Sequence, residues 1–569
     1  MTRGHQSLLK SLLAGCMLAA VGPVLAADVT SDRLVNADKE PHNWLMNHRT
    51  YDGQRFSPLA RIDKGNVKNL KLAYAVPLGG GGGNEYNQAT PLAEDGFLYI
   101  TDSWGVVYKI DGRSGDVGRV VWRMDPKQEQ QRQSRGVALW GNLVISAGNG
   151  PGRVIATNKE TGKVVWETAF PDIASVVITL APLAIKDKII VGAANSGAGI
   201  RDWIAALDAA TGKRVWLKYT VPAPGEPGSE TWKDKNSAWQ TGGAAIWVTG
   251  TYDPETNQTI WGTGNPVPMF DPTYRPGDNL YTDSAISWDA DTGKMNWYFQ
   301  YTPGDHWDYD EAHSHILIDG QVAGQPRKLI THSARNGFVY TMDRNNGQIL
   351  FAKPYMDNIN WTKGIDQKTG RPLDYDPGKD LQTYSGVANH SPSQQMRKVC
   401  PTILGGNNYW PSSYSPRTKL LYVPALTGCD DVTIDTEMHS KERGWNGGKH
   451  VADRLESNLT AVDPITGEIK KNAHLPFPNV SGTLATAGGL IFLGLADGTV
   501  AAFDDTTLEE MWKTNLGAGF NAPPMTFEVN GKQYVAIASG LGGAARSTIA
   551  KTPELKDQRN ATVLYVFGL

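Results

Sequence analysis

Short apolar runs alternate with clusters of turn residues along almost the whole chain. Residues 97–100 and 490–493 are typical: each run is apolar, and each leads directly into a turn that contains Asp, Thr or Gly. Short runs bounded by such residues predict β-strands joined by tight turns. We therefore expect an all-β fold with few helices.

A turn motif recurs along the chain, with an aromatic residue at a nearly constant offset. An Asp or Asn is followed by Thr-Gly or a similar turn and then by Trp or another apolar residue. The copies are Asp111…Gly115…Trp122, Asn158…Gly162…Trp166, Asp208…Gly212…Trp216, Asp289…Gly293…Trp297, Asp343…Gly347…Phe351, Asp463…Gly467 and Asp504…Thr507…Trp512. Such a repeat predicts a β-propeller in which the tryptophans wedge between neighbouring blades. These seven copies, with gaps in their spacing around residues 360–460, suggest eight blades.

The composition agrees with this interpretation. A chain of 569 residues exceeds a single compact core, so it must form several domains or one large closed repeat fold. Its 62 Gly, 33 Pro and 18 Trp suit strands and turns better than long helices.

Residues 222–240 and 354–400 lack the repeat and are rich in Pro, Gly and charge. We expect long insertions there, of the kind that carries binding and access.

The first 27 residues have the order of a secretory signal peptide. Arg3 and Lys10 precede an apolar stretch over residues 12–25, and small residues follow. We expect residues 1–27 to be removed and residues 28–569 to form a single propeller domain in the periplasm. A lipoprotein box ending at Cys16 is the alternative, but the apolar run before it is short. Nowhere else does an apolar run approach the roughly 18 residues of a membrane-spanning helix.

Charge and cysteine content narrow the possibilities further. A formal net charge of −3 is too small to favour nucleic acid or a membrane surface as partner. Without the signal peptide, Cys400 and Cys429 are the two remaining cysteines. In an oxidising compartment they predict one disulfide, provided that they lie close in space. The absence of a CxxCH motif excludes covalently attached haem c on this chain.

One segment concentrates carboxylates and aromatic residues. Residues 301–310 read YTPGDHWDYD, with Asp308 and Asp310 two positions apart. On an extended backbone these two side chains point the same way, and like charges so close are costly unless a cation lies between them. A metal ion is the simplest compensation. An acidic surface turn is the alternative.

Three further segments are unusual in a related way. Trp247 follows the small residues 242–245, which leaves one indole face open to a flat ligand. Asn265 offers a neutral oxygen on a turn, and Arg335 offers a fixed cation. Each alone could be only a turn, but with the aspartate pair they describe a pocket with a flat face, a hard cation and a positive group.

Several motifs resemble one known family. They are Asn43-Trp44, GQRFSPL at 53–59, GGAAIW, WGTGNP, RPGDNLY, TPGDHWDYD, ARNGFVYTMDR, LATAGGLIFLG and GKQYVAIASG, in order from about residue 31 to 569. All are similar to the methanol and ethanol dehydrogenases that depend on pyrroloquinoline quinone (PQQ). The resemblance implies an eight-bladed propeller with PQQ and one metal ion on its axis. It also implies that an alcohol is oxidised by hydride transfer to PQQ, with electrons passed to a separate cytochrome c.

Residue roles follow from the same resemblance, position by position. Asp308 resembles the catalytic base, and Arg335 the arginine beside the reactive quinone oxygens. The residues expected to contact PQQ are Trp247, which stacks on it, and Arg135, Asn408, Gln88, Ala245 and Arg335. The expected metal ligands are Asn265, Asp308 and Asp310, and Cys400 and Cys429 match a family disulfide.

The chain departs from the family pattern at the metal site. Asp310 stands where calcium-type members carry a small residue and lanthanide-type members carry aspartate. Gly197 stands where the family normally supplies a metal-binding glutamate, so one carboxylate is lost where another is gained. The metal is therefore a lanthanide or Ca²⁺, with the lanthanide favoured because a trivalent ion balances an extra carboxylate.

A second departure concerns the cover of the cofactor. Glu129 and Gln130 replace the vicinal cysteine pair that lies over PQQ in methanol and ethanol enzymes, and Gln88 replaces a glutamate. A more open pocket predicts substrates bulkier than methanol, such as secondary, cyclic or polymeric alcohols. Two rival functions remain: a non-catalytic propeller scaffold of the envelope, and a quinoprotein acting on an aldehyde or a sugar-like polyol.

Overall fold

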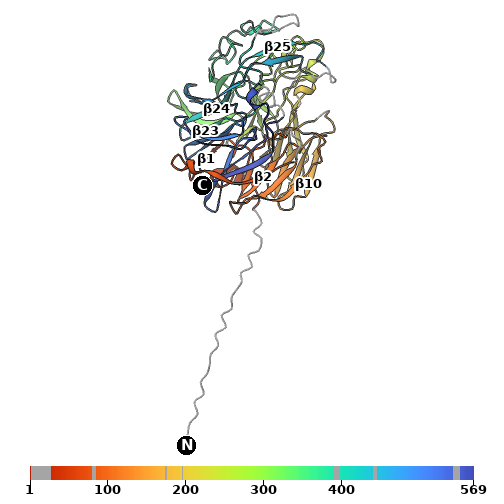
Figure 1. The fold of residues 1–569 in the computed structure, drawn as a ribbon. Coiled ribbons are helices and arrows are strands. Elements are labelled where there is room, and N and C mark those ends of the chain that lie inside the picture. The colour runs from red at the N-terminus through yellow and green to blue at the C-terminus, as the bar shows by residue number, and fades with distance from the viewer. Residues whose placement is uncertain are drawn as a thin grey trace.

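The chain folds into an eight-bladed β-propeller, as the repeat predicted (Figure 1). The computed structural model describes residues 1, 27–79, 85–173, 176–194, 196–388, 398–439, 445–542 and 551–569. Nearly all of the predicted signal peptide, including Cys16, lies outside these residues. Among the described residues, helical structure is limited to α1 (Ser31–Val35) and short 3-10 turns. None of these helices is long and apolar enough to cross a membrane.

The first five blades are four-stranded antiparallel sheets that follow one another along the chain. They are β3–β6 (Leu92–Glu94, Phe97–Thr101, Val107–Asp111, Arg119–Met124), β7–β10 (Ala138–Trp140, Leu143–Gly148, Arg153–Asn158, Val164–Ala169), β11–β14 (Leu183–Ile185, Lys188–Gly192, Trp203–Asp208, Arg214–Tyr219), β15–β18 (Thr251–Asp253, Gln258–Gly262, Ser284–Asp289, Met295–Gln300) and β19–β22 (Ile316–Val322, Gln325–Ser333, Phe338–Asp343, Ile349–Pro354). β11 is buried at every residue, whereas β10 exposes Val164 and Val165. The first strand of a blade is thus the inner one, and the fourth lies at the rim.

Two of the remaining three blades include a strand from the N-terminal part of the chain. The three blades are β23, β24, β27 and β28 (Ser413–Ser415, Leu420–Thr427, Glu456–Val462, Ile469–Leu475), β29–β32 (Thr483–Thr486, Leu490–Gly494, Thr499–Asp504, Glu510–Asn515) with β1 (Phe56–Ser57), and β33–β35 (Met525–Val529, Lys532–Ala538, Val563–Gly568) with β2 (Lys71–Pro77). A separate hairpin, β25–β26 (Asp430–Ile434, Gly448–Ala452), projects between β24 and β27. The expected insertion at 222–240 contains two 3-10 turns, Ser229–Thr231 and Ala238–Thr241.

The repeated tryptophans join neighbouring blades. Trp166 on β10 donates its indole N–H to the carbonyl of Ala209 in the next blade, at 3.2 Å. A Cβ atom on Gly212 would lie 2.5 Å from the Trp166 ring, so the glycine of the turn motif is what lets the ring approach. The same bond to the next blade is made by Trp122 to Lys159, Trp216 to Ala290, Trp297 to Arg344 and Trp512 to Leu70. The predicted wedge is confirmed.

Strands from the two ends of the sequence close the ring. β2 pairs with β35 in antiparallel register, from Lys71 opposite Gly568 to Pro77 opposite Val563. β1 pairs in parallel with β29 of the preceding blade. Figure 1 shows the C-terminus beside β1 and β2. Because the sheets form a closed ring, each blade that the structure describes packs between two neighbouring blades.

Candidate functional site

The predicted site residues lie in loops at one end of the blades. Asp308, Asp310 and Asn408 precede first strands (β19 and β23), whereas Asn265 and Arg335 follow second strands (β16 and β20). In an antiparallel blade, the start of the first strand and the end of the second lie at the same end. These loops therefore meet on one face of the ring, over its centre.

A cavity of about 370 Å³ lies where the loops meet, and we call it the cofactor cavity. Every predicted catalytic, metal-binding and cofactor-binding residue except Ala245 lines it. These residues are Gln88, Arg135, Trp247, Asn265, Asp308, Asp310, Arg335 and Asn408. Ala245 is fully buried, and its carbonyl accepts the N–H of Gly264 at 2.8 Å. Its side chain does not face the cavity, so its contact with PQQ stays a prediction.

Arg335 is held firmly in the wall of the cofactor cavity. Its guanidinium pairs with Asp308 at 2.7 Å and also with Asp310, and its Nε donates to the carbonyl of Ile403 at 2.7 Å. A Cβ on Gly405 would lie 2.0 Å from the Arg335 side chain, so this glycine makes room for it. With a side chain only 4% exposed, Arg335 presents its charge in a fixed position.

The loop that carries Asp308 is shaped by another buried acid. Asp305 accepts the backbone N–H groups of Trp307 at 3.0 Å and Tyr309 at 2.9 Å. Between them Asp308 adopts the left-handed conformation, with φ at 66°, which is uncommon outside glycine. Residues in sparsely populated backbone conformations cluster at functional sites. The turn presents the Asp308 carboxylate to the cavity.

The surroundings of Asp308 disfavour its charged form. Burial raises the pKa of Asp308 well above its ordinary value; Arg335 lowers it, and Asp310 and Asp305 raise it further. A positive ion beside the carboxylate would oppose the effect of burial and favour ionisation. Asp308 is thus suited to act as a base when a cation is bound next to it.

Asn265 and Asp310 form a donor set for a hard cation. One oxygen of Asp310 accepts the backbone N–H of Asn265 at 2.8 Å and the indole N–H of Trp247 at 3.3 Å. The side-chain oxygen of Asn265 is buried and has no hydrogen-bond partner among the described residues. An unsatisfied amide oxygen beside two carboxylates matches the oxygen ligands that Ca²⁺ and similar hard cations prefer. The residues present fit a metal ion.

Gly197 also lines the cofactor cavity and contributes no side chain to it. Among the residues that the structure describes, a Cβ at this position would have one atom within 4.0 Å, the side-chain oxygen of Asn446. These residues leave room for a Cβ, so they do not require a glycine here. The added carboxylate of Asp310 and the position of the missing carboxylate, Gly197, thus line the same cavity.

Arg135 is a buried cation whose bonds within the described chain are to neutral groups. It donates to the hydroxyl of Thr179 at 2.7 Å and to the carbonyl of Trp247 at 2.9 Å. Its guanidinium carbon lies 4.7 Å from the centre of the Trp247 ring, and burial lowers its pKa to about 9. A buried charge without a counter-charge is unfavourable. The site therefore favours an anionic, flat ligand over Trp247, which fits a quinone that carries carboxylates.

Sequence reasoning misses some of the lining. Tyr409 and Thr179 face the cofactor cavity together with Leu404. Tyr409 follows Asn408 directly, and its ring lies 6.3 Å from that of Trp247, so an aromatic residue next to a predicted contact was a usable signal. Thr179 carries no such signal, because a threonine within an apolar stretch is common in strands.

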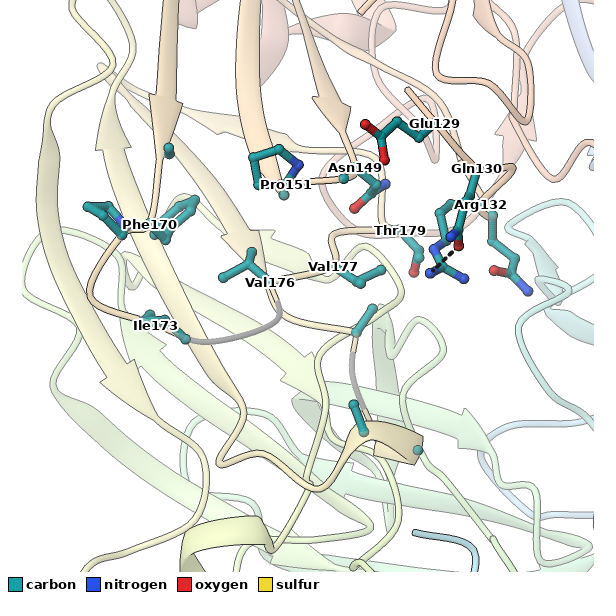
Figure 2. Close-up of a pocket in the computed structure, with 18 residues that line it drawn as sticks. Glu129, Gln130, Arg132, Asn149, Pro151, Phe170, Ile173, Val176, Val177 and Thr179 are labelled. Carbon is teal, nitrogen blue, oxygen red and sulfur yellow. Dashed lines mark hydrogen bonds between the residues drawn. The ribbon is translucent and has the colours of Figure 1, made fainter. Parts of the chain in front are cut away.

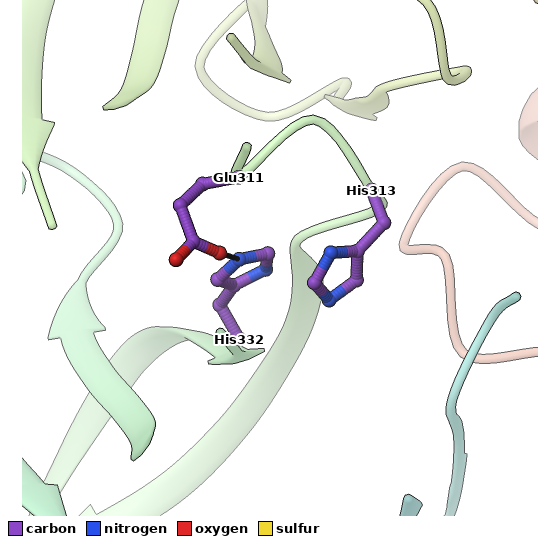
Figure 3. A group of neighbouring side chains, drawn as sticks. All are labelled: Glu311, His313 and His332. Atoms are coloured by element: carbon purple, nitrogen blue, oxygen red, sulfur yellow. Dashed lines mark hydrogen bonds and ion pairs between the residues drawn. The ribbon is translucent and has the colours of Figure 1, made fainter. Parts of the chain in front are cut away.

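A buried acid, Glu311, contacts the loop of Arg335, and sequence reasoning also misses it; Figure 3 shows Glu311 beside His332. One oxygen of Glu311 accepts the backbone N–H of Arg335 at 2.9 Å and lies 2.8 Å from Nε2 of His332. The N–H of Glu311 donates to the carbonyl of Thr263 at 3.0 Å, in the loop of Asn265. Glu311 thus ties together three loops of the site. Its place directly after Asp310 was the available signal.

His332 is the middle ring of three stacked histidines. The ring centres of His313 and His315 lie 4.0 and 3.9 Å from that of His332. Burial lowers the pKa of each well below its ordinary value, so all three are neutral at neutral pH. Glu311, His313 and His332 have the residue types of a metal site. An imidazole nitrogen binds a metal in the ring plane, however, and rings stacked this closely do not aim at one point; the cluster supports the Arg335 loop by packing.

Cys400 and Cys429 form a disulfide, as predicted. The bridged segment continues into the cavity wall, since Ile403 accepts from Arg335 and Pro401 accepts the hydroxyl of Tyr309 at 2.6 Å. The disulfide therefore ties down the backbone that holds Arg335.

Comparison with known proteins matches this architecture to one family. The PQQ family described as glucose/ethanol/alcohol dehydrogenase, β-propeller domain, matches residues 44–353 and 445–535. The quinohemoprotein alcohol dehydrogenase ADH-IIG of Pseudomonas putida is 36% identical over 94% of this chain and 78% of its own length. Its solved structure superposes with a TM-score of 0.87 at 32% identity, over 96% of this chain and 82% of that one.

Two further relatives bear on the chemistry. Subunit 1 of methanol dehydrogenase [cytochrome c] of Methylorubrum extorquens is 34% identical over 94% of this chain and 90% of its own. The structure of a europium-containing methanol dehydrogenase superposes with a TM-score of 0.85 at 29% identity, over 95% of this chain and all of that one. The chain belongs to the family of PQQ-dependent quinoprotein alcohol dehydrogenases.

Proposed function

We propose that the protein oxidises an alcohol to the aldehyde or ketone with PQQ and one metal ion, using Asp308 as the general base. One observation carries this proposal: Asp308, Asp310, Arg335, Asn265 and Trp247, predicted as a set, line one cavity. Arg135, buried there without a counter-charge, supplies the anchor for an anionic cofactor. A non-catalytic scaffold gives no reason for these residues to converge.

The cavity residues divide into those that bind and those that act. Trp247 offers its face to the cofactor, while Arg135 and Asn408 hold its polar edge. When bound, PQQ supplies the quinone that takes up the hydride of the carbinol carbon, and the metal ion supplies Lewis-acid polarisation of the quinone carbonyl. Asp308 takes the hydroxyl proton of the alcohol on its carboxylate. Arg335 keeps Asp308 in place and stabilises negative charge that develops beside it.

Asn265, Asp308 and Asp310 would hold the metal. We propose a lanthanide in preference to Ca²⁺, because Asp310 adds a carboxylate next to the unsatisfied oxygen of Asn265. The europium in a structurally similar methanol dehydrogenase is consistent with this choice. Ca²⁺ remains the alternative, since Gly197 removes one acid from the same cavity.

The acceptor and location follow from the same proposal. We propose that electrons leave to a separate cytochrome c, as the name of the related methanol dehydrogenase indicates for that enzyme. We also propose that residues 1–27 direct the chain to the periplasm and that residues 28–569 form the mature propeller domain. The disulfide between Cys400 and Cys429 is consistent with an oxidising compartment.

The deciding experiment is dye-linked alcohol oxidation by the apo-protein. PQQ would be added with either Ca²⁺ or a light lanthanide, and the series repeated on Asp310→Ala. We expect turnover with the lanthanide and its loss in the variant. Full activity with Ca²⁺ and an unchanged metal response in Asp310→Ala would contradict the lanthanide assignment. If no dye is reduced with any metal, the scaffold function is supported, and a panel of aldehydes and polyols separates the remaining rival.

A further inference from the structure

A second and larger cavity, whose lining residues are drawn in Figure 2, adjoins the cofactor cavity. It encloses about 750 Å³, against about 370 Å³ for the cofactor cavity. We call it the antechamber and identify it by Glu129, Phe170 and Val176 in its wall. The residues that line both cavities are Gln133, Thr179, Ala194 and Gly197. Because the two cavities share these residues, they adjoin each other.

The antechamber has two chemically different walls. On one side are Phe170, Ile173 and Val176, and on the other Glu129 and Arg132, with Gln130 and Asn149 nearby (Figure 2). Phe170 is fixed by its contact with Trp203, whose ring centre lies 4.5 Å away. A ligand that satisfies both walls has an apolar side and a side that forms hydrogen bonds.

The polar wall is available for a ligand. Neither Glu129 nor Arg132 forms an ion pair with a residue that the structure describes, and both are exposed. Arg132 donates to the side-chain oxygen of Gln130 at 3.1 Å. Glu129 and Gln130 line the antechamber and are not part of the cofactor cavity wall. These two residues thus contribute to the wall of the antechamber and do not cover the cofactor cavity.

We propose that the antechamber binds the body of an extended amphiphilic alcohol while its carbinol group reaches Asp308. The inference rests on the proposed function and specifies its substrate class. A volume of about 750 Å³ is in the range of pockets for drug-sized ligands and far exceeds what methanol or ethanol fills. The apolar body packs on Phe170, Ile173 and Val176, and ether, hydroxyl or carbonyl oxygens along its other edge face Arg132 and Gln133.

The first test measures kcat/KM of the holoenzyme for straight-chain primary alcohols from methanol to dodecanol. Burying each additional methylene against the apolar wall should raise kcat/KM about fourfold until the antechamber is filled. A flat profile, or the highest value for methanol or ethanol, would overturn the inference.

Filling the antechamber provides the second test. Val177→Trp places an indole in the wall of the antechamber, two residues before Thr179, which lines both cavities. It should lower kcat/KM for decanol at least about tenfold while leaving ethanol within about twofold. The matched control is Val165→Trp, the same change at a 54% exposed position on β10. Ile173→Phe is a milder filling that serves if Val177→Trp does not fold. Equal losses for ethanol and decanol would contradict the proposal.

The polar wall is tested with an alcohol that carries several ether oxygens, such as a tetraethylene glycol monoalkyl ether. Arg132→Met should lower kcat/KM for this substrate about fivefold, the value of one hydrogen bond, and leave decanol unchanged. If Arg132→Met lowered kcat/KM equally for the glycol ether and for decanol, the proposed hydrogen bond between Arg132 and the substrate would be rejected. If no alcohol of any length is oxidised, the proposed function itself fails; ethanol oxidation without length dependence contradicts only the antechamber.

Discussion

The cofactor cavity and the antechamber are neighbours with opposite construction. In the cofactor cavity, Arg335 is 4% exposed and bonded to two carboxylates and a carbonyl. In the antechamber, Arg132 is exposed, and its side chain donates a hydrogen bond to the side chain of Gln130. Groups that stabilise a transition state must be held in place before reaction, whereas a wall that contacts the substrate body need only match its polarity. The cation that is held in place by several bonds is therefore the one next to Asp308, and the exposed cation is the one in the antechamber.

The largest expected effect is loss of the base. Asp308→Asn keeps the size of the side chain but removes the carboxylate that takes the proton, so kcat should fall about 10²- to 10⁴-fold. PQQ should remain bound, since Trp247 and Arg135 are untouched. Stopped-flow reduction and the absorbance of bound PQQ measure the two separately. Retained turnover would remove Asp308 as the base.

The next prediction tests how far the fixed position of Arg335 matters. Arg335→Lys keeps a positive charge but cannot bond Asp308, Asp310 and Ile403 together, because an ammonium lacks the planar fork of guanidinium. We expect kcat to fall about 10²-fold. The corresponding change in the antechamber, Arg132→Lys, should leave kcat within about twofold. Similar losses at both positions would abolish the contrast between the cavities.

A smaller effect is expected behind the cavity wall. Glu311→Ala leaves the backbone N–H of Arg335 without its acceptor and Nε2 of His332 without its hydrogen-bond partner, which should cost about 1–3 kcal/mol of unfolding free energy. We expect kcat to fall about tenfold while KM changes little. Glu311→Gln retains an acceptor oxygen and should recover most of the activity. Urea unfolding and steady-state kinetics on both variants make the comparison, and a Gln variant as poor as Ala would argue against this positioning role.

The smallest expected effect concerns the metal. Gly197→Glu restores a carboxylate where the described residues leave room for a Cβ, so metal affinity should rise by about tenfold. Combined with Asp310→Ala, it should shift the preference from lanthanide towards Ca²⁺. Titration of apo-protein with each ion, followed by PQQ fluorescence, provides the measurement. A double variant with the original preference would show that Asp310 does not set it.

Sequence patterns predicted the fold and most of the cofactor cavity for identifiable reasons. The Gly212 and Trp166 pair is readable because a close ring contact demands glycine at a fixed offset. Asp308 and Asp310 are readable because two carboxylates two positions apart are costly without a cation between them, and the roles of Asp308 and Arg335 followed from the resemblance to the family. Ala245 is the exception: its position within a recognised motif did not place its side chain in the cavity.

The antechamber was far less accessible to sequence analysis. Glu129 and Gln130 indicated an open cover, but Phe170, Ile173 and Val176 are ordinary apolar residues of a propeller. Glu311 could be suspected from its place after Asp310, whereas its bonds to Arg335 and His332 depend on three loops from separate strands. Local patterns indicate which residues are unusual; the walls they build depend on how the blades are arranged.

The pairing of β2 with β35 determines when the ring of the propeller can close during synthesis of the chain. Lys71–Pro77 are made long before Val563–Gly568, yet they form adjacent strands of one blade. A ring joined by contacts of such long sequence separation closes slowly, because loop-closure entropy must be overcome before the last blade forms. The ring of the nascent chain thus stays open until Val563–Gly568 have been made. Removing only the final strand should prevent closure of a ring whose other blades are all intact.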